Sequence, residues 1–187
     1  MRIITGKAKG ARLETLDGLA TRPTSEKVKE AVFSMIQFET EGRRVLDLFA
    51  GSGQLSLEAL SRGAKEAVLV DSSKQAAEII RRNAVKTKLF AQVKIFTEDY
   101  KSAIRKLEGG ERFDIVFCDA PYAAKLTGDA IARTLDAGLL SDSGVVVCES
   151  DEPEPIMHPG LLVRRHNRYG RTYITVYDAA RDDIDEI

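Results

Sequence analysis

Four consecutive residues, Asp-Ala-Pro-Tyr at 119–122, are of types that could act on an amine, and they directly follow the apolar run FDIVFC. The exocyclic amine of a nucleobase is a poor nucleophile because its lone pair is delocalised into the ring. Asp119 and the main-chain carbonyl of Ala120 could accept its two N–H groups, and the carboxylate could later remove the surplus proton. Pro121 would stiffen the turn, and Tyr122 would offer a ring on which an extruded base stacks. The alternative is an ordinary strand-to-loop turn, which Asp and Pro also favour.

A second stretch, VLDLFAGSGQLSLEAL at 45–60, predicts a cofactor loop. An apolar run leads into the turn of Gly51 and Gly53 and then into a helical pattern, so the backbone can approach a ligand closely. Asp71 ends the next apolar run, where a carboxylate can accept both hydroxyls of a ribose. Asp99 follows the third run and is expected to contact an adenine amine or, alternatively, to cap a helix. We also assign to the cofactor site the neighbouring residues Phe49, Ser72 and Tyr100.

Asp47, four residues before Gly51, helps to choose between two kinds of cofactor. A dinucleotide fingerprint needs a third small residue at position 56, where Ser56 stands, and needs no acid before the turn. S-adenosylmethionine has no pyrophosphate but carries an ammonium group, which an acid on the first strand would attract. We therefore expect S-adenosylmethionine at this loop, with a plain tight turn as the alternative.

The elements that must position these residues alternate along the middle of the chain. Strand-length apolar runs lie at 44–49, 66–71, 92–97, 113–118 and 144–149, with helical stretches at 53–62, 74–88, 99–108 and 124–138. Near-continuous apolar strands separated by helices favour a parallel sheet covered on both faces. After residue 160, two strands around a Tyr169-Gly170 turn are typical of an antiparallel hairpin. The sequence thus predicts a Rossmann-like α/β fold of class I methyltransferase layout, with a mostly parallel seven-stranded sheet.

Residues 1–40 are expected to form a basic extension, and residues 41–187 a single methyltransferase domain. Segments 2–5 and 11–14 could pair as a short hairpin, and a helix then starts with Thr24 as its N-cap and Glu26 in its first turn. The expected apolar stripe of this helix consists of Val28, Ala31, Val32, Met35 and Ile36. Residues 1–12 and 163–177 each carry four basic residues and no acid. They could form one anion-binding surface or be solvated faces.

Composition excludes several classes of protein. The 187 residues carry 28 Lys and Arg against 29 Asp and Glu, so net charge alone predicts no nucleic-acid partner. No apolar run approaches the ~20 residues of a membrane helix, and the sequence starts without a hydrophobic signal segment, so we expect a cytoplasmic protein. Cys118 and Cys148 lie in apolar runs and are expected in the core, whereas His158 and His166 have no partner at metal-ligand spacing. We expect no disulfide and no metal.

Several segments together resemble the RsmD-type 16S rRNA guanine-N2 methyltransferases, over nearly the whole chain. These segments are the basic opening MRIITGKAKGARL, RPTSEKVKEAVFSMI at 22–36, VLDLFAGSGQLSLEALSRGA, and the ending YGRTYITVY. The family usually has Asp-Pro-Pro-Tyr or Asp-Pro-Pro-Phe where this chain has Ala120 in place of the first proline. The main-chain carbonyl is retained, so we expect activity to survive, with a shifted loop or weaker turnover as the alternative.

The resemblance implies methyl transfer from S-adenosylmethionine to N2 of one guanine, position 966 in the usual RNA numbering, within the small ribosomal subunit. RNA phosphates would then contact six basic residues: Arg2, Lys7, Lys9, Arg12, Arg22 and Lys27. We expect a monomer with no membrane partner. Three other functions stay open: a DNA adenine-N6 methyltransferase, a nicotinamide oxidoreductase, and a non-catalytic RNA-binding assembly factor.

Overall fold

The computed structural model describes residues 1–16, 25–120 and 124–180. The helices are α1 (Glu26–Met35), α2 (Gln54–Ser61), α3 (Lys74–Lys86), α4 (Tyr100–Leu107) and α5 (Ala124–Asp136), with a short 3₁₀ turn, η1 (Phe90–Gln92). The strands are β1 (Arg44–Asp47), β2 (Glu66–Val70), β3 (Val93–Phe96), β4 (Phe113–Cys118), β5 (Leu140–Ser150), β6 (Leu161–Tyr169) and β7 (Thr172–Ala179). Among these described residues, no helix is long and apolar enough to cross a membrane.

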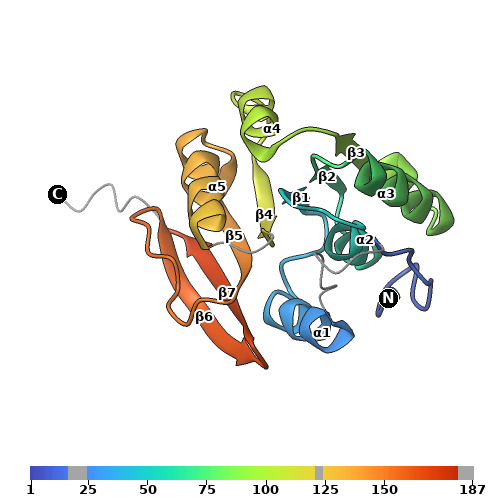
Figure 1. Ribbon diagram of the computed structural model, residues 1–187, viewed down its shortest axis with the longest axis horizontal. Helices are drawn as coiled ribbons and strands as arrows, with labels where there is room; N and C mark the ends of the chain where they lie inside the picture. Colours follow the sequence, from blue (N-terminus) through green and yellow to red (C-terminus); the bar gives the residue numbers. More distant parts are fainter. Residues whose placement is uncertain (17–24, 121–123, 181–187) are drawn as a thin grey trace.

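The seven strands form one sheet in the order β3-β2-β1-β4-β5-β7-β6 (Figure 1). The pairs from β3 to β5 are parallel, whereas β7 is antiparallel to both β5 and β6. The predicted fold class is therefore confirmed, including the antiparallel C-terminal hairpin. The carboxyl ends of β1, β2 and β4 lie side by side, which is where open α/β sheets bind ligands.

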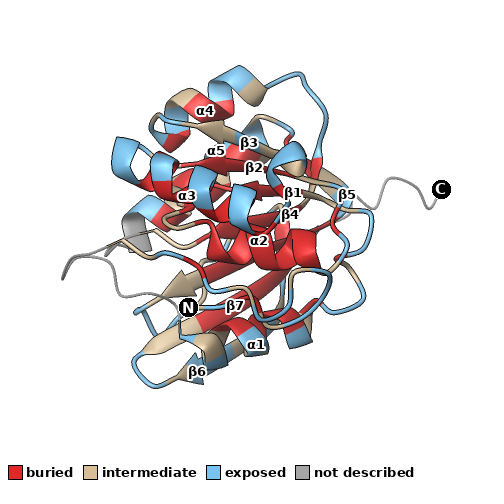
Figure 2. Cartoon of the chain, turned by 90° about the vertical axis from the view of Figure 1, so that its right-hand side faces the viewer, coloured by how far each residue is buried: buried red, intermediate tan, exposed pale blue. Residues whose placement is uncertain are grey.

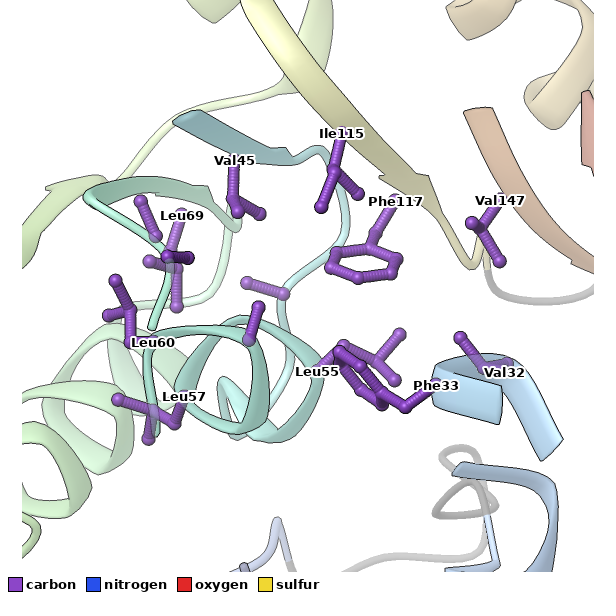
Figure 3. Close-up of a cluster of buried hydrophobic side chains, with 14 of the residues drawn as sticks. Val32, Phe33, Val45, Leu55, Leu57, Leu60, Leu69, Ile115, Phe117 and Val147 are labelled. Atoms are coloured by element: carbon purple, nitrogen blue, oxygen red, sulfur yellow. The ribbon is translucent and has the colours of Figure 1, made fainter. Parts of the chain in front are cut away.

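Helices cover both faces of the sheet because its strands are apolar on both sides. In β1 and β4, Val45, Ile115 and Phe117 pack toward α1 and α2, and Figure 3 shows their side chains on the side of the sheet where Phe33 and Leu55 lie. The alternate residues of the same strands pack against α4 and α5. All eight residues of α2 are buried, and the helix is red along its whole length in Figure 2. The glycine turn before α2 is thus fixed between a buried strand and a buried helix.

The N-terminal segment turns back on itself, but pairs less than expected. The described hairpin consists of an isolated bridge between Arg2 and Arg12, supported by the bonds Ile3 N to Ala11 O and Leu13 N to Met1 O, both 2.9 Å. Instead of extended strand pairing, the segment uses α2 as its partner. Glu58 is fully buried in α2, and its carboxylate accepts the backbone N–H groups of Ile4 (2.8 Å) and Thr5 (3.0 Å).

Helix α1 starts one residue later than predicted. Its N-cap is Ser25, whose Oγ accepts the N–H of Val28 at 3.2 Å, so the expected cap at Thr24 is wrong. Glu26 lies in the first turn, as predicted. The buried face includes Val32 and Ile36, as predicted, but it is wider than predicted because Lys29 and Phe33 are also fully buried. Buried Lys29 is accommodated because its Nζ lies 3.4 Å from Glu58 Oε2 and donates to the carbonyl of Arg2.

Candidate active site

The turn after β1 is built around two glycines in the left-handed region of backbone conformation. Gly51 has φ +56° and Gly53 has φ +79°, which L side chains rarely adopt. A Cβ on Gly53 would also lie 3.1 Å from Leu69 Cδ2 and 3.4 Å from Ile80 Cγ1. Both the torsion and the close packing therefore require glycine at position 53. The turn leaves backbone groups of the loop at the carboxyl end of β1, just before the N-terminus of α2.

Asp47, at the end of β1, is only 2% exposed. Its Oδ2 accepts the Ser56 hydroxyl at 2.9 Å, whereas its buried Oδ1 accepts no hydrogen bond among the described residues. Burial raises the pKa of Asp47 to about 7, against the opposing effects of the Ser56 hydroxyl and the backbone amide of Phe49. A buried acceptor without a donor is costly, so a ligand that brings an N–H or ammonium group would satisfy it.

Asp71, just after the neighbouring strand β2, connects the loop that follows β1 to the loop that follows β2. Its Oδ2 accepts the N–H of Gly51 and its Oδ1 accepts the N–H of Ser73, both at 2.9 Å. Each carboxylate oxygen retains a lone pair for a further donor. Ser72, between these contacts, is exposed. The structure therefore brings Asp71 and the glycine turn together, in the position from which a carboxylate could accept hydroxyls.

Asn83 also holds the loop, and the sequence reasoning did not identify it. This fully buried α3 residue donates from Nδ2 to the carbonyls of Ser52 and Glu14, both at 2.9 Å. Its Oδ1 accepts the N–H of Glu14 at 2.8 Å. One signal was available: Asn83 is a polar residue between Ile80 and Ala84 on a stripe that is otherwise apolar. Ser56, which positions Asp47, enters the sequence analysis only as a departure from the dinucleotide fingerprint.

Asp99 and Tyr100 follow β3, and their side chains make different contacts: Tyr100 contacts Phe49 of the loop after β1, whereas Asp99 caps α4. The Tyr100 ring lies against Phe49, with centroids 5.3 Å apart, and its hydroxyl donates to Asp129 Oδ2 at 2.6 Å. Burial and that carboxylate raise the pKa of Tyr100 to about 12. Asp99 is the N-cap of α4 and accepts the N–H groups of Lys101 and Ser102. The capping alternative for Asp99 is thus confirmed, and its contact with an adenine stays a prediction.

Asp119 follows β4, the strand beside β1. The β1–β4 register pairs Asp47 with Phe117, so Asp119 lies two residues beyond Asp47 along the same edge of the sheet. Neighbouring strands are about 4.8 Å apart, which makes Asp119 a close neighbour of the glycine turn. Asp119 and Ala120 are half-buried. Pro121 and Tyr122 lie outside the described residues.

The predicted RNA-binding residues that the structure describes have different surroundings. Arg2 pairs with Glu26 at 3.2 Å, near the start of α1. Lys7 donates from Nζ to Gln92 Oε1 at 2.7 Å, near the end of α2 and the start of β3, and so lies toward the amino edge of the sheet. Lys9, Arg12 and Lys27 are exposed, and Arg22 lies outside the described residues. The role of this set in RNA binding stays a prediction.

A family model described as "Conserved hypothetical protein 95" matches residues 1–178. The chain belongs to this family. Curated relatives include the "Putative rRNA methyltransferase YlbH" of Bacillus subtilis, 35% identical over 95% of this chain and 98% of the relative. The "Ribosomal RNA small subunit methyltransferase D" of Escherichia coli is 31% identical over 81% of this chain and 75% of the relative. The resemblance to the RsmD-type methyltransferases is thereby confirmed.

Solved structures agree with this family and with the class I methyltransferase fold. The "Putative methyltransferase yhhF from Escherichia coli" superposes with a TM-score of 0.86 at 29% identity, over 96% of this chain and 97% of that one. A methylase from Haemophilus influenzae superposes with a TM-score of 0.80 at 26% identity, over 95% and 97% of the two chains. Family membership and fold together place the chain among class I methyltransferases.

Proposed function

We propose that the protein transfers a methyl group from S-adenosylmethionine to N2 of a guanine in small-subunit ribosomal RNA, at position 966 in the usual RNA numbering. The observation that carries the proposal is the neighbourhood of two carboxylates at one sheet edge. Asp47 ends β1 beside the glycine turn, and Asp119 follows the adjacent strand β4 two residues further along. A donor held by the first and an amine held by the second would be oriented toward each other, which accounts for much of the rate of such transfers.

The residues around the glycine turn fit this cofactor. Asp47 offers to an ammonium group its Oδ1, and Gln54, the first residue of α2, has a buried Oε1; neither atom has a hydrogen-bond partner among the residues that the structure describes. Asp71 is placed to accept ribose hydroxyls, while Phe49 and Tyr100 form an aromatic pair beside the loop. When bound, the sulfonium supplies an activated methyl group. The chain's own residues therefore need only bind, orient and exclude water.

Asp119 and the Ala120 carbonyl are proposed to hold the guanine amine. Accepting both N–H groups would orient the nitrogen lone pair toward the donor, and Asp119 would take the surplus proton after transfer. Tyr122 is proposed to stack on the base. Substitution of the family's proline by Ala120 leaves the carbonyl that this arrangement uses. The relatives named for rRNA methylation support an RNA substrate.

Methyl transfer from radiolabelled S-adenosylmethionine would test the proposal. The substrate would be small subunits from cells that lack the enzyme, and the product would be mapped by nuclease digestion and mass spectrometry. The wild type should produce N2-methylguanine at one site. Asp119→Asn, which is nearly isosteric, should lose at least a hundredfold in kcat while the Kd for S-adenosylmethionine stays within about twofold.

Control and contrary outcomes separate this proposal from its rivals. Asp114→Asn, a change on β4 near the opposite edge of the sheet, should leave kcat unchanged if the protein remains folded. Unchanged kcat in Asp119→Asn would refute the role of Asp119. Transfer to adenine in duplex DNA would identify a different substrate class, and binding of a nicotinamide cofactor in preference to S-adenosylmethionine would refute the donor.

A further inference from the structure

A groove of about 380 Å³ lies between the end of α1 and strand β6, on the same face of the sheet as α2. We call it the α1–β6 groove. Its lining includes Met35, Phe38, Glu39, Arg165, Asn167 and Tyr169. Figure 2 shows α1 and β6 next to each other at one end of the molecule. None of these residues belongs to the methyl-transfer site described above.

The groove exposes an aromatic ring that the fold does not use. Phe38 is 92% exposed, so it contributes little to the core. Met35 and Tyr169 form partly buried walls that pack on the core beneath. Exposed flat rings beside a polar groove are the usual platform on which an unstacked base rests. This pattern differs from an ordinary apolar surface patch because polar groups share the same groove.

Glu39 provides the second observation. Its Oε1 pairs with Arg164 at 2.6 Å, whereas its Oε2 is buried and accepts no hydrogen bond within the described part of the chain. Asp47 and Gln54, at the cofactor loop, are the other residues with such buried unpaired acceptors there. A ligand with N–H donors would satisfy Oε2, and the amino and imino groups of nucleobases are donors of this kind.

Arg165 gives the groove a cation that an anionic group could contact. A bulge in β6 between Val163 and Arg165 allows Arg164 to pair with both Glu39 and Asp178, so its single positive charge is shared by two carboxylates. Arg165 lines the groove, is exposed, and has no acidic partner among the residues that the structure describes. A free guanidinium beside an aromatic ring and an amide matches a phosphate followed by a base.

The strand register gives the separation between Asp119, after β4, and the groove residue Asn167 on β6. The last β4–β5 pair is Cys118 with Cys148, so the next residues, Asp119 and Glu149, lie at the same level of the sheet. At that level Glu149 pairs with Ile174 of β7, and Ile174 pairs with Asn167 of β6. Three strand spacings separate β4 from β6, or about 14 Å. A single strand of RNA with its target base at Asp119 could span that distance with a few nucleotides.

We propose that the α1–β6 groove binds one unstacked nucleotide of the RNA strand that flanks the methylated base. Phe38 would stack on the base, Glu39 would accept one of its N–H groups, and Arg165 would contact the adjoining phosphate. The inference rests on the proposed function for the identity of the RNA. It adds a binding subsite that contributes affinity and register to a strand whose reacting base is held elsewhere.

RNA binding and methyl transfer should be measured separately, on the full-length protein. Phe38→Ala should weaken binding of a fluorescein-labelled single-stranded RNA dodecamer about fivefold or more in fluorescence anisotropy, as expected for the loss of one stacked base. Arg165→Gln should also weaken binding and lower the slope of log Kd against log salt by about 0.7, the value for one phosphate contact. Both variants should raise KM for RNA and leave kcat and the Kd for S-adenosylmethionine unchanged.

Matched controls lie away from the groove. Met157→Ala removes a side chain that is 77% exposed, and Arg105→Gln removes an exposed charge on α4; both should bind the dodecamer like the wild type. Wild-type affinity in Phe38→Ala and Arg165→Gln would overturn the inference. A dimer that dissociates only in Phe38→Ala, with RNA binding unchanged, would identify a second copy as the occupant and also overturn it.

The two proposals fail in different ways. If no RNA is methylated but dodecamer binding still depends on Phe38 and Arg165, the groove stands and the proposed reaction falls. If methyl transfer is normal and naked RNA binds equally to all variants, the reaction stands and the groove inference falls. Loss of activity only on assembled subunits, with unchanged binding to naked RNA, would indicate a protein contact and would overturn the RNA subsite.

Discussion

Substitution of Asp47 by Asn tests whether a buried charge is maintained for ligand binding at the expense of stability. The pKa of Asp47 is about 7 in the folded protein against an ordinary 3.8, chiefly because of burial. Each pH unit of that difference corresponds to about 1.4 kcal/mol. The ionised carboxylate therefore lowers the free energy of unfolding by roughly 4 kcal/mol above pH 7, relative to a neutral group of the same shape.

The direction in which the free energy of unfolding changes with pH follows from whether the folded or the unfolded chain holds the Asp47 proton. Between about pH 4 and pH 7 the folded protein keeps the Asp47 proton and the unfolded chain releases it, so stability falls as pH rises through this range. Asp47→Asn lacks this dependence, while its packing and the Ser56 contact change by an amount that is independent of pH. The stability advantage of the variant over the wild type should therefore grow by about 3 kcal/mol from pH 5 to pH 8.

Urea unfolding of both proteins at pH 5 and pH 8, without cofactor, measures this change. Asp142→Asn is the control, because its carboxylate is 92% exposed and its loss should shift stability equally at both pH values. A constant difference between Asp47→Asn and the wild type would refute the reasoning. In the same variants, S-adenosylmethionine should stabilise the wild type at pH 8 much more than Asp47→Asn, because only the wild type offers a carboxylate to the ammonium group.

Three further substitutions test the supports of the site. Lys29→Met should lower the free energy of unfolding by about 1–3 kcal/mol because buried Glu58 then keeps only one of its two cationic partners, Arg62 at 2.8 Å, and a double change with Glu58→Gln should recover part of that loss in urea unfolding. Asn83→Ala should lower it by about 1–3 kcal/mol and speed amide hydrogen exchange in the glycine loop, since the Ser52 carbonyl loses its donor. Gly53→Ala should lower Tm and raise the Kd for S-adenosylmethionine at least tenfold by calorimetry, because its Cβ meets core side chains; an unchanged Kd would contradict this.

The sequence predicted the central fold well because its strands are short, apolar and regularly interrupted. The strand predicted at 113–118 matches β4 residue for residue, and the helices after each strand start within one residue of the prediction. Local patterns suffice here because parallel strands buried on both faces leave little choice of residue. β5 is longer than predicted: it begins at Leu140 rather than 144, with a register irregularity against β4 that breaks the simple pattern.

Predictions that depended on long-range contacts were weaker. Lys29 is charged, and its burial depends on partners that the fold supplies, the carboxylate of Glu58 far along the chain and the carbonyl of Arg2. The stripe predicted for α1 therefore lacks Lys29 and Phe33, while Ala31, expected in the stripe, lines the groove. Asn83 was missed for the same reason, since its partners are brought to it by the fold.

The contacts of Glu58 and Asn83 also constrain the order in which the chain can fold. Ile4 binds Glu58, which lies 54 positions further along the chain, and Glu14 binds Asn83, which lies 69 positions further along. During synthesis the opening basic segment must therefore wait, undocked, until α2 and α3 have emerged. Because Asn83 also holds the glycine loop, docking of the segment at Glu14 and support of the loop at Ser52 both depend on α3. A protein stalled before α3 would lack both together.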